Sequence, residues 1–162
     1  MQISLRKAVP TDVPAIHALV RELAIYEKAE TEFVATITEY ESDFAAGVYD
    51  AILAEAEGKI VGMALYYLAY STWKGKMLYL EDFVVFQEYR RYGIGQMLFD
   101  AFLDEARRMG CRLVKWQVLD WNEPALKFYE KNRAVIEKEW WNGKIFLQSE
   151  PQEMCLAPEQ IY

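Results

Sequence analysis

The chain has 162 residues, of which 53% are hydrophobic and 15% aromatic, and this length and composition predict a single domain over residues 1–162. Its 25 Asp and Glu residues outweigh 18 Lys and Arg residues, and a net charge of -7 argues against nucleic acid as a partner. No apolar run approaches the roughly 18 residues of a membrane helix, and no apolar leader follows the polar N-terminus. We therefore expect a cytoplasmic protein with no membrane partner.

Cysteine usage is sparse. Cys111 and Cys155 lie far apart in the sequence, and neither belongs to a C-x-x-C or Cys/His group. The sequence therefore predicts two reduced thiols and no bound metal.

The N-terminal part predicts a short strand and two helices. Ile3 and Leu5 alternate with polar residues, as in a strand. A helix then runs from about Asp12 to about Tyr26, with apolar residues at helical spacing at Ile16, Leu19, Val20 and Leu23. Thr36 and Glu39 have the spacing of a capping box, which predicts a second helix ending near Gly47.

The middle and C-terminal parts predict a meander followed by a crossover. Three antiparallel strands are expected at residues 49–54, 60–70 and 77–86. A helix of about 16 residues then ends at Gly110, which precedes a strand at 113–119. A helix at 123–131, with Asn122 as its N-cap, and a closing hairpin of strands 135–140 and 145–148 complete the elements. We expect the tail after about residue 150 to be loose or to dock on a partner subunit.

This element order predicts an α+β fold. The strand at 77–86, the helix after it and the strand at 113–119 form a crossover, which favours parallel pairing. The expected sheet is therefore mixed but mostly antiparallel, with helices on both faces. Ligands of such sheets bind near the carboxyl ends of strands.

The most informative segment is the junction between the strand at 77–86 and the helix that follows. Arg90, Arg91, Gly93 and Gly95 lie within six residues there. Glycines let successive backbone N–H groups approach an anion at the positive end of a helix, and arginines add charge. The residue types fit an anion cradle, and they equally fit an ordinary turn with solvated arginines.

Two familiar phosphate loops are excluded by spacing. No G-K-[ST] follows the glycines, and Leu98 stands where a dinucleotide-binding fingerprint requires a third glycine. The remaining pattern is R-x-x-G-x-G at residues 90–95.

This pattern resembles the pyrophosphate loop of the GNAT superfamily of acetyl-CoA-dependent N-acetyltransferases. The residues at 122–129, NEPALKFY, resemble a second family signature, N-x-x-A-x-x-F-Y, in the same order along the chain. Longer words narrow the resemblance to the spermidine/spermine (diamine) N-acetyltransferases and their thialysine-acetylating relatives; these words are LYLEDF at 78–83, YRRYGIG at 89–95 and WNEP at 121–124. Arg133 departs from the pattern, because the family usually has glycine there.

The resemblance implies a catalytic pair. An aliphatic ammonium has a pKa near 10 and must lose a proton before it attacks a thioester. The family assigns this base role to Glu81, acting through a water, and the general-acid role to Tyr129. Asp82 would point to the opposite face of a regular strand, whereas a bulge would turn it toward the amine. A solvated Glu-Asp pair at a strand edge is the structural alternative.

The resemblance also implies where acetyl-CoA and its acceptor bind. Cofactor contacts are expected along the end of the strand, the loop, the helix start and two later positions: Phe83, Val84, Val85, Arg90, Arg91, Gly93, Ile94, Gly95, Gln96, Asn122 and Lys131. A backbone N–H near Val84 would hold the oxyanion. Acceptor contacts are expected at Tyr26, Glu27, Glu81, Asp82 and Trp116. Trp116 and Trp140 would stack on the acceptor's methylenes or fill the core.

The sequence therefore predicts an N-acetyltransferase that uses acetyl-CoA as co-substrate and acetylates a primary amine of a polyamine, diamine or thialysine-like molecule. Neither cysteine lies in a motif, which favours direct transfer in a ternary complex. Acetylation of a protein amine and a non-catalytic CoA-binding sensor are the alternatives. The family resemblance further implies a homodimer.

Overall fold

The computed structural model describes residues 2–147 and divides them into two compact units, with the boundary between Gln117 and Val118. The first unit contains all five strands and three α-helices: β1 (Ile3–Lys7), α1 (Val13–Tyr26), α2 (Ile37–Ala45), β2 (Asp50–Ala56), β3 (Lys59–Ser71), β4 (Gly75–Val85), α3 (Ile94–Arg108) and β5 (Leu113–Lys115). Short 3-10 helices lie at Pro10–Asp12, Glu30–Glu32 and Gln87–Tyr89. The second unit contains α4 (Glu123–Lys131).

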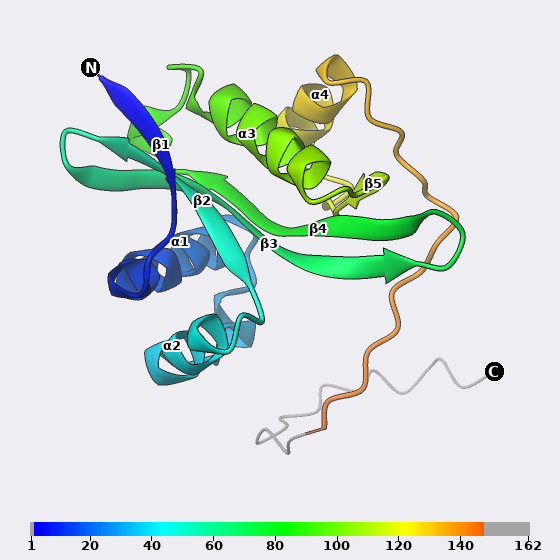
Figure 1. The fold of residues 1–162 in the computed structure, drawn as a ribbon, viewed down its shortest axis with the longest axis horizontal. Coiled ribbons are helices and arrows are strands. Elements are labelled where there is room, and N and C mark those ends of the chain that lie inside the picture. Colours follow the sequence, from blue (N-terminus) through cyan, green and yellow to red (C-terminus); the bar gives the residue numbers. More distant parts are fainter. Residues whose placement is uncertain (1, 148–162) are drawn as a thin grey trace. The chain divides into compact units, whose positions relative to one another are not determined.

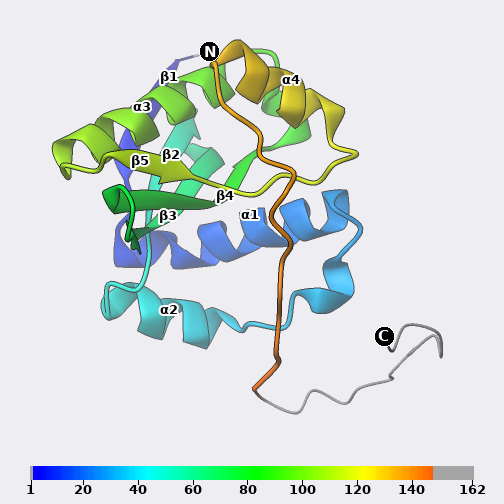
Figure 2. The same cartoon turned by 90° about the vertical axis from the view of Figure 1, so that its right-hand side faces the viewer.

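The strands of the first unit form one sheet in the order β1-β2-β3-β4-β5. Successive strands are antiparallel except β4 and β5, which are parallel because α3 forms a crossover between them. Helices α1 and α2 lie on one face of the sheet and α3 lies on the other (Figures 1 and 2). The predicted mixed, mostly antiparallel sheet with helices on both faces is confirmed.

Local signals explain several boundaries. Thr36 and Glu39 form the predicted capping box of α2, in which the Glu39 carboxylate accepts from the Thr36 backbone N–H at 2.7 Å. Glu57 and Gly58 join β2 to β3 with φ values of 52° and 75°, the positive pair that a type I′ hairpin turn requires. Gly62 is required by close packing, since a Cβ there would lie 2.9 Å from the Val84 carbonyl oxygen.

Each face of the sheet has its own apolar layer. On the α1 face, a fully enclosed cluster joins the helix to β2, β3 and β4 through Ile16, Leu19, Leu53, Met63 and Val84. On the opposite face, Leu98 and Phe102 of α3 are completely buried, and the Phe102 ring packs against Tyr66 of β3. Helical spacing on α1 and α3 and alternation along the strands therefore build two layers around one sheet.

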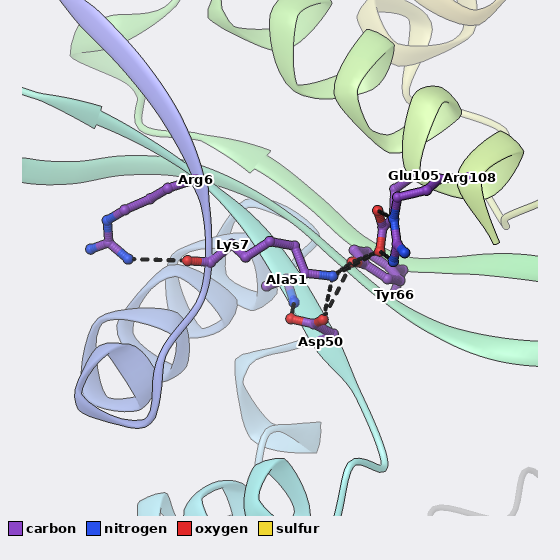
Figure 3. Close-up of polar contacts among 7 residues, drawn as sticks. All are labelled: Arg6, Lys7, Asp50, Ala51, Tyr66, Glu105 and Arg108. Carbon is purple, nitrogen blue, oxygen red and sulfur yellow. Dashed lines mark hydrogen bonds and ion pairs between the residues drawn. The ribbon is translucent and has the colours of Figure 1, made fainter.

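A cluster of paired charges, the Lys7 cluster, lies on the α3 face and comprises Lys7, Asp50, Tyr66, Glu105 and Arg108 (Figure 3). The Lys7 ammonium contacts the carboxylates of Asp50 and Glu105 and donates to the Tyr66 hydroxyl. Arg108 adds two hydrogen bonds of 2.7 Å to Glu105. These cations lower the pKa of Glu105 to about 2. The cluster ties strands β1, β2 and β3 to α3.

Two predicted elements differ from the structure. The strand expected at 113–119 is shorter, since β5 ends at Lys115. The hairpin expected at 135–140 and 145–148 is wrong for its described part, because residues 134–147 form no strand. Side chains such as Val135, Trp141 and Leu147 are more than 80% exposed there, and a hairpin without a packed apolar face is at best marginally stable. Gln148 and the tail lie outside the described residues.

The end of α4 shows how the chain accommodates Arg133. The backbone N–H of Ala134 bonds the carbonyl of Tyr129, and that of Arg133 bonds the carbonyl of Glu130, as in a Schellman motif. This ending needs a left-handed residue, and Arg133 supplies it with φ 60° while Asn132 keeps a negative φ. The missing glycine is thus replaced by a strained arginine.

Candidate active site

The N-terminus of α3 is open to an anion. Gly93 is its N-cap, with φ 79°, and no side chain caps this end of the helix. The first backbone N–H groups of α3 therefore keep their capacity to bind a ligand, and the positive end of the helix dipole favours an anionic one. The predicted cradle residues Arg91, Ile94 and Gln96 lie at this end of the helix. Arg91 has a left-handed backbone with φ 70°.

The space around Gly95 is consistent with a cofactor-binding role. Among residues 2–147, a Cβ built there would meet only the Phe83 ring, at 3.8 Å, which is an ordinary contact. No steric demand of the fold therefore requires glycine at this position, whereas the close approach of a diphosphate does. The residues present fit acetyl-CoA bound with its diphosphate at this helix end.

Arg90 turns back over the end of β4. Its Nε donates to the carbonyl oxygen of Val85 at 3.0 Å, and its guanidinium lies 5.1 Å from the centre of the Tyr26 ring. Tyr26 ends α1, so this cation–π contact joins the α3 loop to the helix that precedes Glu27.

Strand β5 covers only part of the edge of β4, since it pairs with β4 from Met77 to Tyr79. Among the described residues, no strand continues this pairing along Val84 and Val85. The backbone of these two residues can therefore pair with an extended ligand, as in the addition of a strand. The predicted cofactor contacts Phe83, Val84 and Val85 lie at the end of β4.

A β-bulge interrupts the regular alternation of side chains along β4 at its two acidic residues. Leu65 of β3 pairs with Asp82 and the next residue, Tyr66, pairs with Leu80, which leaves Glu81 as the extra residue. In a regular strand Glu81 and Asp82 would point to opposite faces. The bulge places both carboxylates in one cavity, as we expected from the sequence for a bulge at this point.

This cavity, the acidic cavity, has a volume of about 320 Å³ and lies between α2, the loop before β2, β3 and β4. Its carboxylates are Glu81 and Asp82 from β4 and Glu39 and Asp43 from α2. Tyr40, Tyr49 and Tyr67 supply aromatic walls, and none of the described residues lining it is Lys, Arg or His. The arrangement suits an alkyl chain that carries positive charge.

Electrostatics inside the cavity are those of neighbouring like charges. Burial raises the pKa of Asp82 to about 7, and the neighbouring charges of Glu81 and Glu27 act in the same direction. Burial also raises the pKa of Glu27. Asp82 can therefore gain or lose a proton near neutral pH, which is what a general base requires.

The tyrosines of the acidic cavity remain hydrogen-bond donors at neutral pH. Burial and nearby carboxylates raise the pKa of Tyr40 and Tyr67, and burial raises that of Tyr49 to about 12. The Tyr67 hydroxyl donates to Glu81 at 3.0 Å, and the Tyr49 hydroxyl donates to the Tyr40 carbonyl at 3.0 Å.

Other predicted residues lie elsewhere. Trp116 does not line the acidic cavity, and its ring meets Phe99 of α3 edge-on at 5.7 Å, on the other face of the sheet. His17 of α1 is half-buried: its ring packs on Phe33 and Tyr40, and its Nε2 lies 2.9 Å from the Ala35 carbonyl oxygen. It supports the segment that carries α2.

The second unit carries the remaining predicted residues. Tyr129 is buried on α4, with its ring edge-on to Phe128 at 5.5 Å. Asn122 is the N-cap as predicted, and its side-chain oxygen accepts from the Ala125 N–H at 3.3 Å. Lys131 is exposed at the last turn of α4, and Trp140 is 68% exposed.

The sequence did not reveal Tyr40, Asp43, Tyr49 and Tyr67 as cavity residues. The i and i+4 spacing of Glu39 and Asp43 on one face of α2 was the available signal. Their meeting with β4 depends on the packing of α2, which no local pattern encodes.

Two general features complete the description. Within residues 2–147, no helix combines the length and apolarity that crossing a membrane demands. Over the same range, no three His, Cys, Asp or Glu side chains form a group suited to a metal ion.

The fold and the site define an acyltransferase class, and comparisons with known proteins agree. Residues 14–134 match the Acetyltransferase (GNAT) family. Thialysine N-epsilon-acetyltransferase of Bos taurus is 36% identical over 152 residues, covering 86% of this chain and 89% of that protein. Spermidine/spermine N(1)-acetyltransferase-like protein 1 of Homo sapiens is 30% identical over 162 residues, covering 93% of this chain and 23% of that protein.

The fold is also similar to that of solved acetyltransferase structures. A crystal structure of an aminoglycoside acetyltransferase from an uncultured soil metagenomic sample superposes with a TM-score of 0.76 at 20% identity, covering 90% of this chain and 97% of that one. The chain belongs to the GNAT acetyltransferase family, and it is an N-acetyltransferase that depends on acetyl-CoA.

Proposed function

We propose that this enzyme acetylates a primary amine of a small molecule that carries a second amine, such as a diamine, a polyamine or a thialysine-like amino acid. The observation that carries the proposal is the acidic cavity, in which two adjacent carboxylates of β4 face two carboxylates of α2 across tyrosine rings. A cation with an apolar middle matches these walls better than an anionic or neutral acceptor does.

The names of the relatives support this substrate class. The bovine protein is named for thialysine and the human one for spermidine and spermine, all of which carry more than one amine. A bulky protein amine fits a cavity of about 320 Å³ less well than a flexible small molecule does.

The chemistry requires a neutral amine. Because an alkylammonium has a pKa near 10, a base must take its proton, and Glu81 performs this step through a water in the proposed mechanism. Asp82, with a pKa of about 7, can share that proton near neutrality. The amine nitrogen then attacks the thioester carbonyl carbon directly.

The remaining roles fall to residues along the cofactor path. Backbone N–H groups at the start of α3 bind the diphosphate, and the free edge of β4 at Val84 and Val85 pairs with the extended arm of acetyl-CoA. A backbone N–H near Val84 stabilises the oxyanion, and Tyr129 donates a proton to the departing thiolate. Asn122 and Lys131 contact the cofactor arm.

Assembly and location complete the proposal. We keep the expectation of a cytoplasmic location, and the resemblance implies a homodimer. Exposed apolar side chains between residues 135 and 147, Trp141 among them at 95%, give a partner subunit a surface to cover. Light scattering after size-exclusion chromatography measures the oligomeric state directly.

The function is tested by following thiol release from acetyl-CoA with a panel of amines: spermidine, putrescine, thialysine, butylamine and a lysine-containing peptide. We expect release with the acceptors that carry two or more amines, and much lower rates with butylamine. Release with the peptide alone would instead support a protein acetyltransferase. A protein that binds CoA but releases no thiol with any amine would be a sensor.

A further inference from the structure

Tyr67 holds the carboxylate that the proposed function uses as the base. Its hydroxyl donates to Glu81 Oε2 at 3.0 Å, and its ring stacks on Tyr79 with centroids 5.2 Å apart and planes 19° apart. We propose that Tyr67 is a positioning residue for the reaction, which fixes the Glu81 carboxylate toward the amine. This inference rests on the proposed function only in taking Glu81 as the base.

Glu81 needs such support because of its place in the sheet. It is the extra residue of the bulge, so no residue of β3 stands opposite it and the regular ladder does not fix its direction. Its side chain is also exposed. A long, exposed carboxylate retains several rotamers, and a catalytic geometry requires one. The Tyr67 hydroxyl is the hydrogen-bond donor that the described structure gives the Glu81 carboxylate.

The ring of Tyr67 is itself held in place. Tyr67 and Tyr79 are paired residues on adjacent strands, and their stacked rings stand on the face of the sheet that bears the acidic cavity. Two strands therefore set the position of one hydroxyl. Because Oε2 of Glu81 receives this bond, the proposed mechanism assigns contact with the amine, or with a water between them, to Oε1.

Tyr67 also keeps the proton that it donates. Burial and the Glu81 charge raise the pKa of Tyr67, so it remains a phenol and a hydrogen-bond donor at neutral pH. Other titratable groups near Glu81 come from the end of α1, from α2, from the loop before β2 and from β4: Glu27, Glu39, Tyr40, Asp43, Tyr49, Tyr79 and Asp82. None of these groups is a cation, so the Tyr67 hydroxyl is the donor among them that is bonded to Glu81.

The chain offers a matched control. Tyr67→Phe removes the hydroxyl that bonds Glu81 while keeping the ring stack. Tyr79→Phe removes a hydroxyl from the other ring of the same stack and leaves the Tyr67 bond to Glu81 intact. Both variants keep the packing, so a difference between them reports the bond to Glu81.

The first measurement is the pH profile of kcat/KM for a diamine, with acetyl-CoA saturating. For Tyr67→Phe we expect kcat to fall about tenfold with an unchanged KM for acetyl-CoA, and the acid limb to move to higher pH. Tyr79→Phe should keep the wild-type limb. Equal effects of the two variants, or an unshifted limb in Tyr67→Phe, would overturn the inference.

The second measurement does not need turnover. Carboxyl carbon NMR of the wild type, Tyr67→Phe and Glu81→Gln assigns the Glu81 carboxyl signal. Its chemical shift should change in Tyr67→Phe, which loses the hydrogen bond, and stay in place in Tyr79→Phe. If wild-type protein acetylated no amine, the proposed function would fail, yet this comparison would still support or overturn the role of Tyr67 toward Glu81.

Discussion

The Lys7 cluster and the acidic cavity place carboxylates on opposite faces of one sheet in opposite electrostatic settings. Glu105 has Lys7 and Arg108 beside it, and its pKa falls to about 2. Asp82 has Glu81 and Glu27 beside it, and its pKa rises to about 7. The fold thus supplies cations where carboxylates hold strands to a helix, and it omits them where a cationic substrate is expected to supply the charge.

The largest expected effect is on kcat, and it distinguishes the acidic cavity from the Lys7 cluster. Glu81→Gln keeps shape but removes the proposed base, and we expect kcat to fall about 100-fold or more with unchanged affinity for acetyl-CoA. Glu105→Gln makes the same chemical change in the Lys7 cluster and should leave kcat within about twofold. The thiol-release assay compares them, and equal losses would show that charge at Glu81 has no special role.

Gly95→Asp introduces a carboxylate at a third place, the start of α3. A negative charge near a helix N-terminus stabilises the helix by about 0.3–1 kcal/mol, whereas the same charge repels a bound diphosphate by several kcal/mol. We expect acetyl-CoA affinity to fall about 100-fold or more while the thermal midpoint holds or rises. Calorimetric titration with acetyl-CoA and thermal melts measure the two, and undiminished affinity would place the diphosphate elsewhere.

A smaller effect tests the far wall of the acidic cavity. Asp43→Asn should raise the KM for a diamine about fivefold, since an exposed ion pair contributes about 1 kcal/mol, and should leave the KM for butylamine unchanged. Glu41→Gln is the matched control, because Glu41 lies on α2 but does not line the cavity. Parallel changes in both variants would indicate a general charge effect.

The smallest effect appears in the pH dependence of stability. Because the pKa of Glu105 is lowered from 4.5, its contribution to stability is present above that pH and is lost as pH falls toward about 2. Because the pKa of Asp82 is raised from 3.8, its contribution is favourable below that pH and is lost as pH rises through about 7.

Two variants separate these contributions. Glu105→Gln should lower the free energy of unfolding at pH 7 by about 1–2 kcal/mol and flatten the acid slope. Asp82→Asn should remove the decline between pH 4 and 7, so that the variant exceeds the wild type at pH 8. Urea unfolding across this pH range checks both variants. If the free energy of unfolding of the wild type rose relative to that of Asp82→Asn between pH 4 and 7, the assigned environment of Asp82 would be contradicted.

The sequence predicted those parts of the molecule that local rules determine. The capping box of Thr36 and Glu39, the N-cap Asn122 and the glycines at the start of α3 follow from spacing, and all lie as predicted. The importance of Glu81 and Asp82 came from a resemblance; the bulge that turns both carboxylates into one cavity is a property of strand pairing.

The sequence did not predict those features whose positions depend on tertiary contacts. Tyr67 and Asp43 enter the cavity because β3 pairs with β4 and α2 packs on α1, and the spacing of Glu39 and Asp43 on α2 does not by itself show that they meet β4. The apolar alternation after Arg133 suggested a hairpin, yet residues 134–147 pair with no strand and their apolar side chains are exposed. Alternation indicates which residues could share a face, but a partner surface decides whether a strand forms.

The most direct test is a crystal structure of the protein with CoA and a bound diamine. We predict the diphosphate on the backbone N–H groups at the start of α3, and one amine nitrogen within hydrogen-bond distance of Glu81 or Asp82 inside the acidic cavity. A diphosphate bound away from this helix end, or a diamine outside the cavity with its carboxylates still unpaired, would contradict the account.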